Sequence, residues 1–105
     1  MDTNNILEKI EIIKRRLEEL QEELKEIKIE GSNEDNTITA VVSGKGRILD
    51  YQLKLGQIGA LNKNTLIKAV VDASNNALKA AKQLEATKKK EIIGDINIPD
   101  IPGLF

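Results

Sequence analysis

The sequence predicts one α+β domain in which a long helix, three antiparallel strands and a second long helix follow one another. Apolar residues repeat every three or four positions through the first 28 residues, which is typical of a helix with one apolar face. Apolar and polar residues then alternate on either side of a Gly-Lys-Gly turn, which indicates strands. Helical spacing of alanine, leucine and lysine returns after residue 62. The chain of 105 residues has the length of a single domain.

The first helix is predicted from residue 5 to residue 28. Its apolar residues are separated by alternating gaps of four and three positions, the spacing of a coiled-coil seam. A small sheet cannot cover so long a helix, so we expect the distal part of the seam to meet a second copy of the chain. Burial of the whole seam within one chain is the alternative. The seam residues are Ile6, Ile10, Ile13, Leu17, Leu20, Leu24 and Ile27.

The middle of the chain predicts three strands, over residues 27–30, 37–43 and 47–55, with a Gly44-Lys45-Gly46 turn between the second and the third. The apolar side chains that alternate onto one face are Ile38, Ala40 and Val42 in the second strand and Leu49, Tyr51, Leu53 and Leu55 in the third. One apolar and one polar face predict an antiparallel sheet that is covered on one side only. Residues 56–62 are expected to form a loop.

The second helix is predicted over residues 64–91, with Asn62 or Asn64 as its N-cap. Its apolar face is predicted to comprise Ile67, Val70, Val71, Ala77, Leu78, Ala81 and Leu84. Pro99 and Pro102 are incompatible with a further helix. The sequence therefore predicts a domain over residues 1–94 and an extended tail over residues 95–105, whose apolar side chains dock on a partner or on the domain itself.

The composition excludes several classes of function. The chain has no cysteine and no histidine, which excludes disulfides, zinc fingers, cysteine nucleophiles and histidine-based triads. The segment Gly44-Lys45-Gly46-Arg47 lacks the spacing of a phosphate-binding loop. We therefore expect no enzymatic activity, no cofactor and no metal site. No apolar run is long enough for a membrane span and no secretory signal is evident, so we expect a cytoplasmic protein without a membrane partner.

The charge of the chain is unevenly distributed. The formal net charge is only −1, yet residues 63–91 contain seven basic and three acidic side chains, whereas residues 1–30 contain six basic and nine acidic ones. The positive charge therefore lies mainly on one flank of the second predicted helix. That flank is either a solvated surface or a site for a polyanion.

The order of these elements resembles the YbaB/EbfC family of bacterial nucleoid-associated DNA-binding proteins. The resemblance covers the whole chain and is carried by the order of its segments, of which the most telling are Ile29-Glu30-Gly31-Ser32, Val42-Ser43-Gly44, Ala73-Ser74-Asn75-Asn76-Ala77 and Ile101-Pro102-Gly103-Leu104-Phe105. It implies an α-β-β-β-α protomer that dimerises through its sheet, with helical arms that clamp duplex DNA. It also implies a role in chromosome organisation or in modulation of transcription, and a location at the nucleoid.

Charge and resemblance together predict a homodimer that binds duplex DNA through phosphate contacts with little sequence preference. The residues that we expect to make these contacts are Lys79, Lys82, Lys88, Lys89 and Lys90, then Lys14, Arg15 and Arg16, then Lys45 and Arg47. A different class of function remains as the alternative. In that alternative the chain is a dimeric coiled-coil adaptor that binds a protein partner through its acidic first helix or through its apolar tail.

Overall fold

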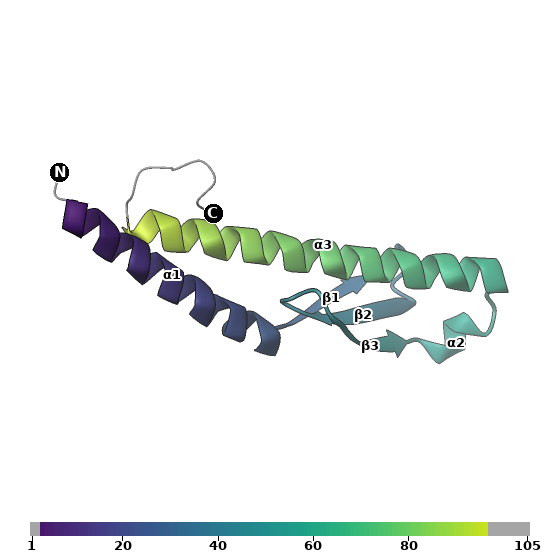
Figure 1. Ribbon diagram of the computed structural model, residues 1–105. Helices are drawn as coiled ribbons and strands as arrows, with labels where there is room; N and C mark the ends of the chain where they lie inside the picture. The colour runs from purple at the N-terminus through teal and green to yellow at the C-terminus, as the bar shows by residue number, and fades with distance from the viewer. Residues whose placement is uncertain (1–2, 97–105) are drawn as a thin grey trace.

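The computed structural model describes residues 3–96, which form an elongated α+β domain of 67 × 23 × 17 Å (Figure 1). Its elements, in chain order, are α1 (Thr3–Glu26), β1 (Lys28–Ser32), β2 (Ile38–Ser43), β3 (Ile48–Leu53), α2 (Leu55–Ile58) and α3 (Lys63–Ile96). The predicted α-β-β-β-α order is confirmed, and a one-turn helix, α2, replaces part of the expected loop. Residues 97–105, most of the predicted tail, lie outside the described residues.

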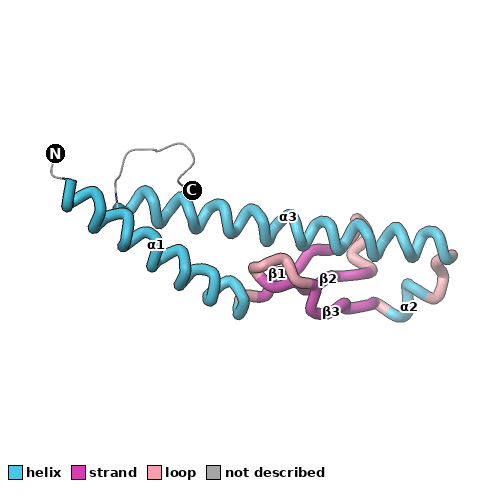
Figure 2. The backbone as a smooth tube through the Cα atoms, viewed as in Figure 1, coloured by secondary structure: helices cyan, strands magenta, loops and turns pink. Residues whose placement is uncertain are grey.

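The three strands form one antiparallel sheet in the order β1-β2-β3. α3 packs across one face of this sheet with its N-terminal half, and its C-terminal half extends beyond the sheet alongside α1 (Figures 1 and 2). Within the described residues, no helix covers the opposite face, so the prediction of a sheet covered on one side is confirmed. The molecule thus has a sheet end and a two-helix arm.

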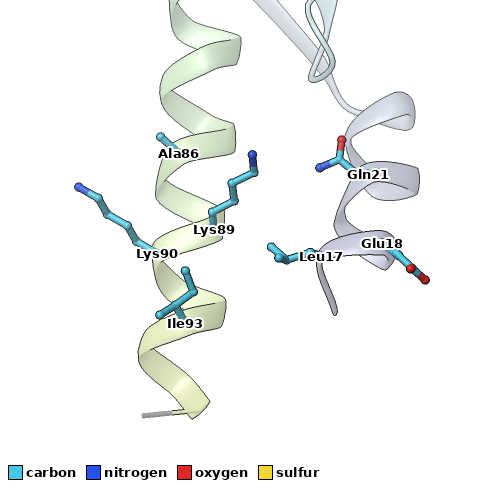
Figure 3. Close-up of a pocket in the computed structure, with 7 residues that line it drawn as sticks. All are labelled: Leu17, Glu18, Gln21, Ala86, Lys89, Lys90 and Ile93. Atoms are coloured by element: carbon cyan, nitrogen blue, oxygen red, sulfur yellow. The ribbon is translucent and has the colours of Figure 1, made fainter. Parts of the chain in front are cut away.

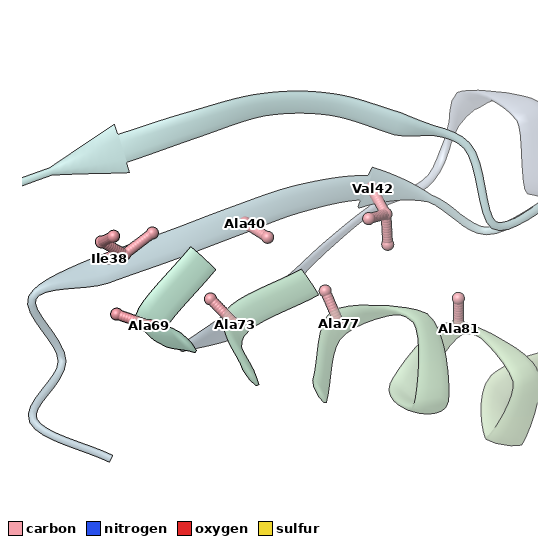
Figure 4. Packing of buried hydrophobic residues seen from close by; sticks show 7 residues of the cluster. All are labelled: Ile38, Ala40, Val42, Ala69, Ala73, Ala77 and Ala81. Atoms are coloured by element: carbon pink, nitrogen blue, oxygen red, sulfur yellow. The ribbon is translucent and has the colours of Figure 1, made fainter. Parts of the chain in front are cut away.

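Alanines of α3 form the core against the sheet. Ala69, Ala73, Ala77 and Ala81 recur every four residues and face the buried side chains of β2 (Figure 4). These side chains are small, so the helix axis can lie close to the strands. Two larger residues of the predicted apolar face, Ile67 and Val71, are instead 50% and 48% exposed. That part of the prediction is wrong because the alanine stripe, not the bulkier side chains, defines the surface that contacts the sheet. The core cluster comprises Ile38, Ala40, Val42, Ala69, Ala73, Ala77 and Ala81.

β1 approaches α3 closely at a glycine. A Cβ added to Gly31 would lie 2.2 Å from the backbone nitrogen of Ala77. One residue away, the Asn76 side chain donates a hydrogen bond of 2.8 Å to the carbonyl of Ser32. On the other edge of the sheet, the Tyr51 hydroxyl lies 2.6 Å from Ser74 Oγ, which donates its own proton to the carbonyl of Val70. Tyr51 must therefore donate to Ser74.

A bulge shifts the pattern of β3. Val41 pairs with Asp50 and Val42 with Ile48, which leaves Leu49 without a partner on β2. Because cross-strand partners share a face, Ile48 takes the helix side and Leu49 moves to the uncovered side. The predicted position of Leu49 on the apolar face is therefore wrong. β3 also ends before Leu55, which begins α2 and is 75% exposed.

Three residues of the α1 seam are buried within the chain. Ile13, Leu20 and Leu24 are fully or almost fully buried, whereas Ile6, Ile10, Leu17 and Ile27 are half-buried. α1 ends at Glu26, so Ile27 lies in the link to β1. The part of the seam nearest the sheet thus packs inside one protomer, and a contact of its distal part with a second copy stays a prediction.

α3 is longer than predicted at its C-terminal end. It begins at Lys63, where Asn62 Oδ1 accepts a hydrogen bond of 2.8 Å from the backbone N–H of Thr65, as expected for an N-cap. It continues through Gly94 to Ile96 instead of ending near residue 91. Gly94 costs the helix some stability but does not break it. The first two residues of the predicted tail are therefore helical.

Candidate nucleic-acid interface

Five exposed lysines follow one side of α3. Helical geometry of 100° per residue places them within an arc of about 100°, opposite the alanine stripe, and the first and last are about 33 Å apart along the axis. The set comprises Lys68, Lys79, Lys82, Lys89 and Lys90 and is called the lysine stripe below. Its length is close to one turn of B-form DNA, ~34 Å.

The lysine stripe differs from the predicted basic cluster at two positions. Lys88 is half-buried and lies about 100° around the helix from Lys89, so consecutive numbering does not place it with its neighbours. Lys68 is not among the residues predicted to bind phosphate, although it stands eleven residues before Lys79. Eleven residues are close to three helical turns, and that spacing is the signal that could have identified it.

The β2–β3 hairpin adds a basic group beside the stripe. Gly46, with φ of 83°, makes the turn that allows Lys45 Nζ to donate a hydrogen bond to Gln21 Oε1 of α1. Lys45 and Lys82 line the same hollow, of about 200 Å³. The fold thus brings these two predicted residues together. Arg47 is exposed on the hairpin, and the described part of the chain contains no ion pair to it.

One carboxylate lies among these lysines. Lys89 Nζ is 3.2 Å from Glu85 Oε1. Burial alone would raise the pKa of Glu85, but hydrogen bonds from Lys89 and Gln21 and the positive charges of Lys89 and Lys45 outweigh it, so the pKa is lowered below 4.5. Glu85 is therefore ionised at neutral pH and partly neutralises Lys89.

The basic residues of α1 are dispersed. Arg16 lies 3.8 Å from Asp95 near the end of α3. Arg15 shares a hollow with three glutamates of its own helix, and Lys14 is exposed. A phosphate at Arg15 would also meet those carboxylates, so α1 is electrostatically the weaker surface for a polyanion.

Exposed apolar side chains concentrate at the sheet end. Within the described residues, six of the eight large apolar side chains that are exposed belong to β3, α2 and the first turns of α3, and the other two, Leu7 and Ile12, to α1. The six are Ile48, Leu49, Leu53, Leu55, Ile67 and Val71, and they are called the apolar patch below. Ile48 and Leu49 point to opposite sides of the edge strand β3, so the patch surrounds this end of the domain, and such a concentration of exposed apolar side chains on a small domain is typical of an interaction surface.

Comparison with known proteins identifies relatives along the whole chain. The chain is 29% identical over 102 residues to a nucleoid-associated protein of Clostridium kluyveri, and the alignment covers 97% of this chain and 87% of the relative. It is 27% identical over 105 residues to a nucleoid-associated protein of Desulfotalea psychrophila, covering 100% and 99%. The crystal structure of an uncharacterized protein from Helicobacter pylori has the same fold, with a TM-score of 0.72 and 17% identity over 90% of this chain and 99% of that one.

Within residues 3–96, no helix is both long and apolar enough to cross a membrane.

A family model described as the YbaB/EbfC DNA-binding family matches residues 1–96, nearly the whole chain and all of the domain described above. The resemblance noted in the sequence is thereby confirmed: the chain belongs to the YbaB/EbfC DNA-binding family.

Proposed function

We propose that this protein binds duplex DNA as a homodimer, chiefly through phosphate contacts from the lysine stripe, and that it organises the chromosome or modulates transcription at the bacterial nucleoid, in the cytoplasm. The observation that carries the proposal is the stripe itself, five exposed lysines on one side of a rigid helix. The family description and the names of the relatives support DNA as the polyanion.

The stripe favours backbone contacts over base reading. Lysine is a point charge that neutralises a phosphate and releases condensed counterions, which gives affinity without sequence information. Direct reading of bases relies largely on arginine, asparagine or glutamine at a groove. Among the exposed residues of α3 between Lys68 and Lys90, only Asn75, Asn76 and Gln83 are of those types, and Asn76 is bonded to Ser32.

The apolar patch supports dimerisation at the sheet end. β3 is an edge strand of the sheet, and such an edge offers unpaired backbone groups to another chain. The apolar patch lies on this strand and the adjoining helices. A second copy that covers this surface would bury apolar area and double the number of lysines available to one DNA molecule.

A titration of a fluorescent duplex of random sequence at several salt concentrations tests the DNA-binding part. With about six phosphate contacts, the slope of log affinity against log salt should be near −5. The double variant Lys82→Ala with Lys90→Ala should weaken binding and reduce the slope by about 1 for each phosphate that is no longer neutralised. The matched control is Lys28→Ala with Lys54→Ala, which removes the same charge away from α3.

Two outcomes would contradict this assignment. Equal weakening by both double variants would mean that the overall charge, not the stripe, determines binding. An affinity that hardly changes with salt would exclude phosphate contacts as its main source.

Light scattering after size exclusion tests the dimer and its surface. We expect a mass of twice 11.6 kDa for the unmodified chain and of 11.6 kDa for Ile67→Glu, which places a charge in the apolar patch. Leu7→Glu is the comparison, because Leu7 is similarly exposed but lies on the distal part of α1. Dissociation by Leu7→Glu and not by Ile67→Glu would move the interface to the helical arm.

A further inference from the structure

A partly apolar groove runs between α1 and the C-terminal half of α3 (Figure 3). Leu17, Ala86 and Ile93 supply its apolar surface, and its volume is about 560 Å³, within the usual range of ligand-binding clefts. Lys89 and Lys90 border it on α3, and Glu18 and Gln21 border it on α1. The groove is thus apolar inside, with positive charge on one edge.

We propose that the occupant of this groove is the C-terminal segment of the same chain, residues 97–105. α3 ends at Ile96, less than one turn beyond Ile93. Nine extended residues can span at most about 30 Å. The distance back along the helix from Ile96 to Ala86 is only about 15 Å. The described end of the helix therefore lies close to the groove, and nine residues are enough to reach back along its whole length.

The chemistry of the segment matches the groove. Its apolar side chains are Ile98, Ile101, Leu104 and Phe105, which suit the surface made by Leu17, Ala86 and Ile93. Pro99 and Pro102 restrict the backbone to extended conformations, which lowers the entropy lost on docking. Asp100, midway along the segment, complements the charges of Lys89 and Lys90. Lys89 and Lys90 also belong to the lysine stripe, so a docked segment would cover that end of the stripe and leave Lys68, Lys79 and Lys82 for phosphate contacts. Docking itself does not require DNA.

A single tryptophan reports directly on docking. The chain contains no tryptophan, so Phe105→Trp in the full-length protein provides one fluorophore at the end of the segment. We expect its emission to be shifted to the blue relative to a peptide of residues 97–105 with the same substitution, and its quenching by acrylamide to be weaker. Both effects should be independent of protein concentration.

A groove variant and a matched control locate the contact. Ala86→Glu fills the groove and places a charge opposite Asp100, whereas Thr87→Glu adds the same charge on the next exposed residue of α3, which does not line the groove. In the Phe105→Trp background, Ala86→Glu should abolish the blue shift and Thr87→Glu should leave it unchanged. Circular dichroism verifies that both variants retain their helices.

Three results would overturn the proposal. The first is peptide-like emission from the Phe105→Trp protein, and the second is an equal effect of Ala86→Glu and Thr87→Glu. The third is recovery of the blue shift when the protein carrying Phe105→Trp and Ala86→Glu is mixed with an excess of the unmodified chain. Such recovery would mean that the segment docks in the groove of another copy.

Discussion

Replacement of Gly31 by alanine tests the close approach of β1 to α3. The new Cβ would lie 2.2 Å from the nitrogen of Ala77, 2.6 Å from its Cα and 2.8 Å from the carbonyl carbon of Asn76. All three atoms belong to the backbone of α3, so no side chain can rotate away to make room. β1 and α3 would have to separate by about 1 Å at Ala77, a member of the core, where close packing tolerates little change.

The expected cost follows from two contributions. Overpacking of a core costs ~1–3 kcal/mol, and a clash between two backbones belongs at the upper end of that range. Separation of β1 from α3 also strains the hydrogen bond from Asn76 to Ser32, which is worth ~1 kcal/mol. A total of about 3–4 kcal/mol is a large part of the stability of a small domain, and it corresponds to a fall in Tm of roughly 12–32 °C.

Thermal unfolding, monitored by circular dichroism, measures this effect. All variants are compared at one protein concentration, because association shifts the apparent Tm. Gly94→Ala is the matched control, since Gly94 is exposed within α3 and its Cβ would meet no atom within 4 Å. It should raise stability by ~0.5–1 kcal/mol through its higher helix propensity. A Gly31→Ala protein with the same Tm as the unmodified chain would refute the argument from close approach.

Three further predictions follow from polar contacts. Asn76→Ala should lower the free energy of unfolding by ~1 kcal/mol in urea because it removes the hydrogen bond to β1. Asn75→Ala, at an exposed position whose side chain makes no hydrogen bond within the described residues, should change it by less than ~0.5 kcal/mol. The Glu85→Gln protein should be less stable than the unmodified chain at neutral pH. Because folding lowers the pKa of Glu85, the ionised carboxylate stabilises the fold above the unfolded-state pKa, and this stabilisation disappears as the pH falls through the folded-state pKa. The Tm values of the two proteins should therefore converge below pH 4.5. In DNA titrations, Lys79→Ala should weaken binding more than Lys89→Ala, because Glu85 already neutralises part of the charge of Lys89; equal losses would argue against this.

The order and type of the elements could be predicted because local patterns determine them. The heptad spacing of α1, the alternation in β2 and the Gly44-Lys45-Gly46 turn each act over a few residues. Two residues of the Asn75-Asn76-Ala77 segment have structural roles that the sequence did not reveal. The Asn76 side chain donates a hydrogen bond to β1, and the backbone of α3 at Ala77 lies so close to β1 that only a glycine fits at position 31. Such roles depend on which strand lies opposite, which local patterns do not contain.

The predictions that were wrong concern residues of similar polarity, among which tertiary packing decides which are buried. A regular alternation cannot reveal that a bulge will exclude Leu49 from the helix side, because the bulge depends on the register with β2. Ile67 and Val71 have the right period for a buried face, but α3 contacts the sheet through its alanines. The exposure of these larger residues has a consistent explanation if they serve a second interface, which is why they enter the proposed dimer surface.

The low net charge of the chain does not oppose binding to a polyanion, because charges of opposite sign occupy different surfaces. α1 carries seven glutamates, whereas the lysine stripe projects from the side of α3 opposite the sheet. At physiological ionic strength, exposed charges are screened beyond ~8 Å, so a phosphate at Lys79 responds to nearby side chains and hardly to the sum over the chain. Where the two helices meet, Glu85 pairs with Lys89, and Glu18 of α1 borders the same groove, so the local field is reduced there. The affinity should therefore be concentrated toward the sheet end of α3, which is also where a second copy would add its own lysines.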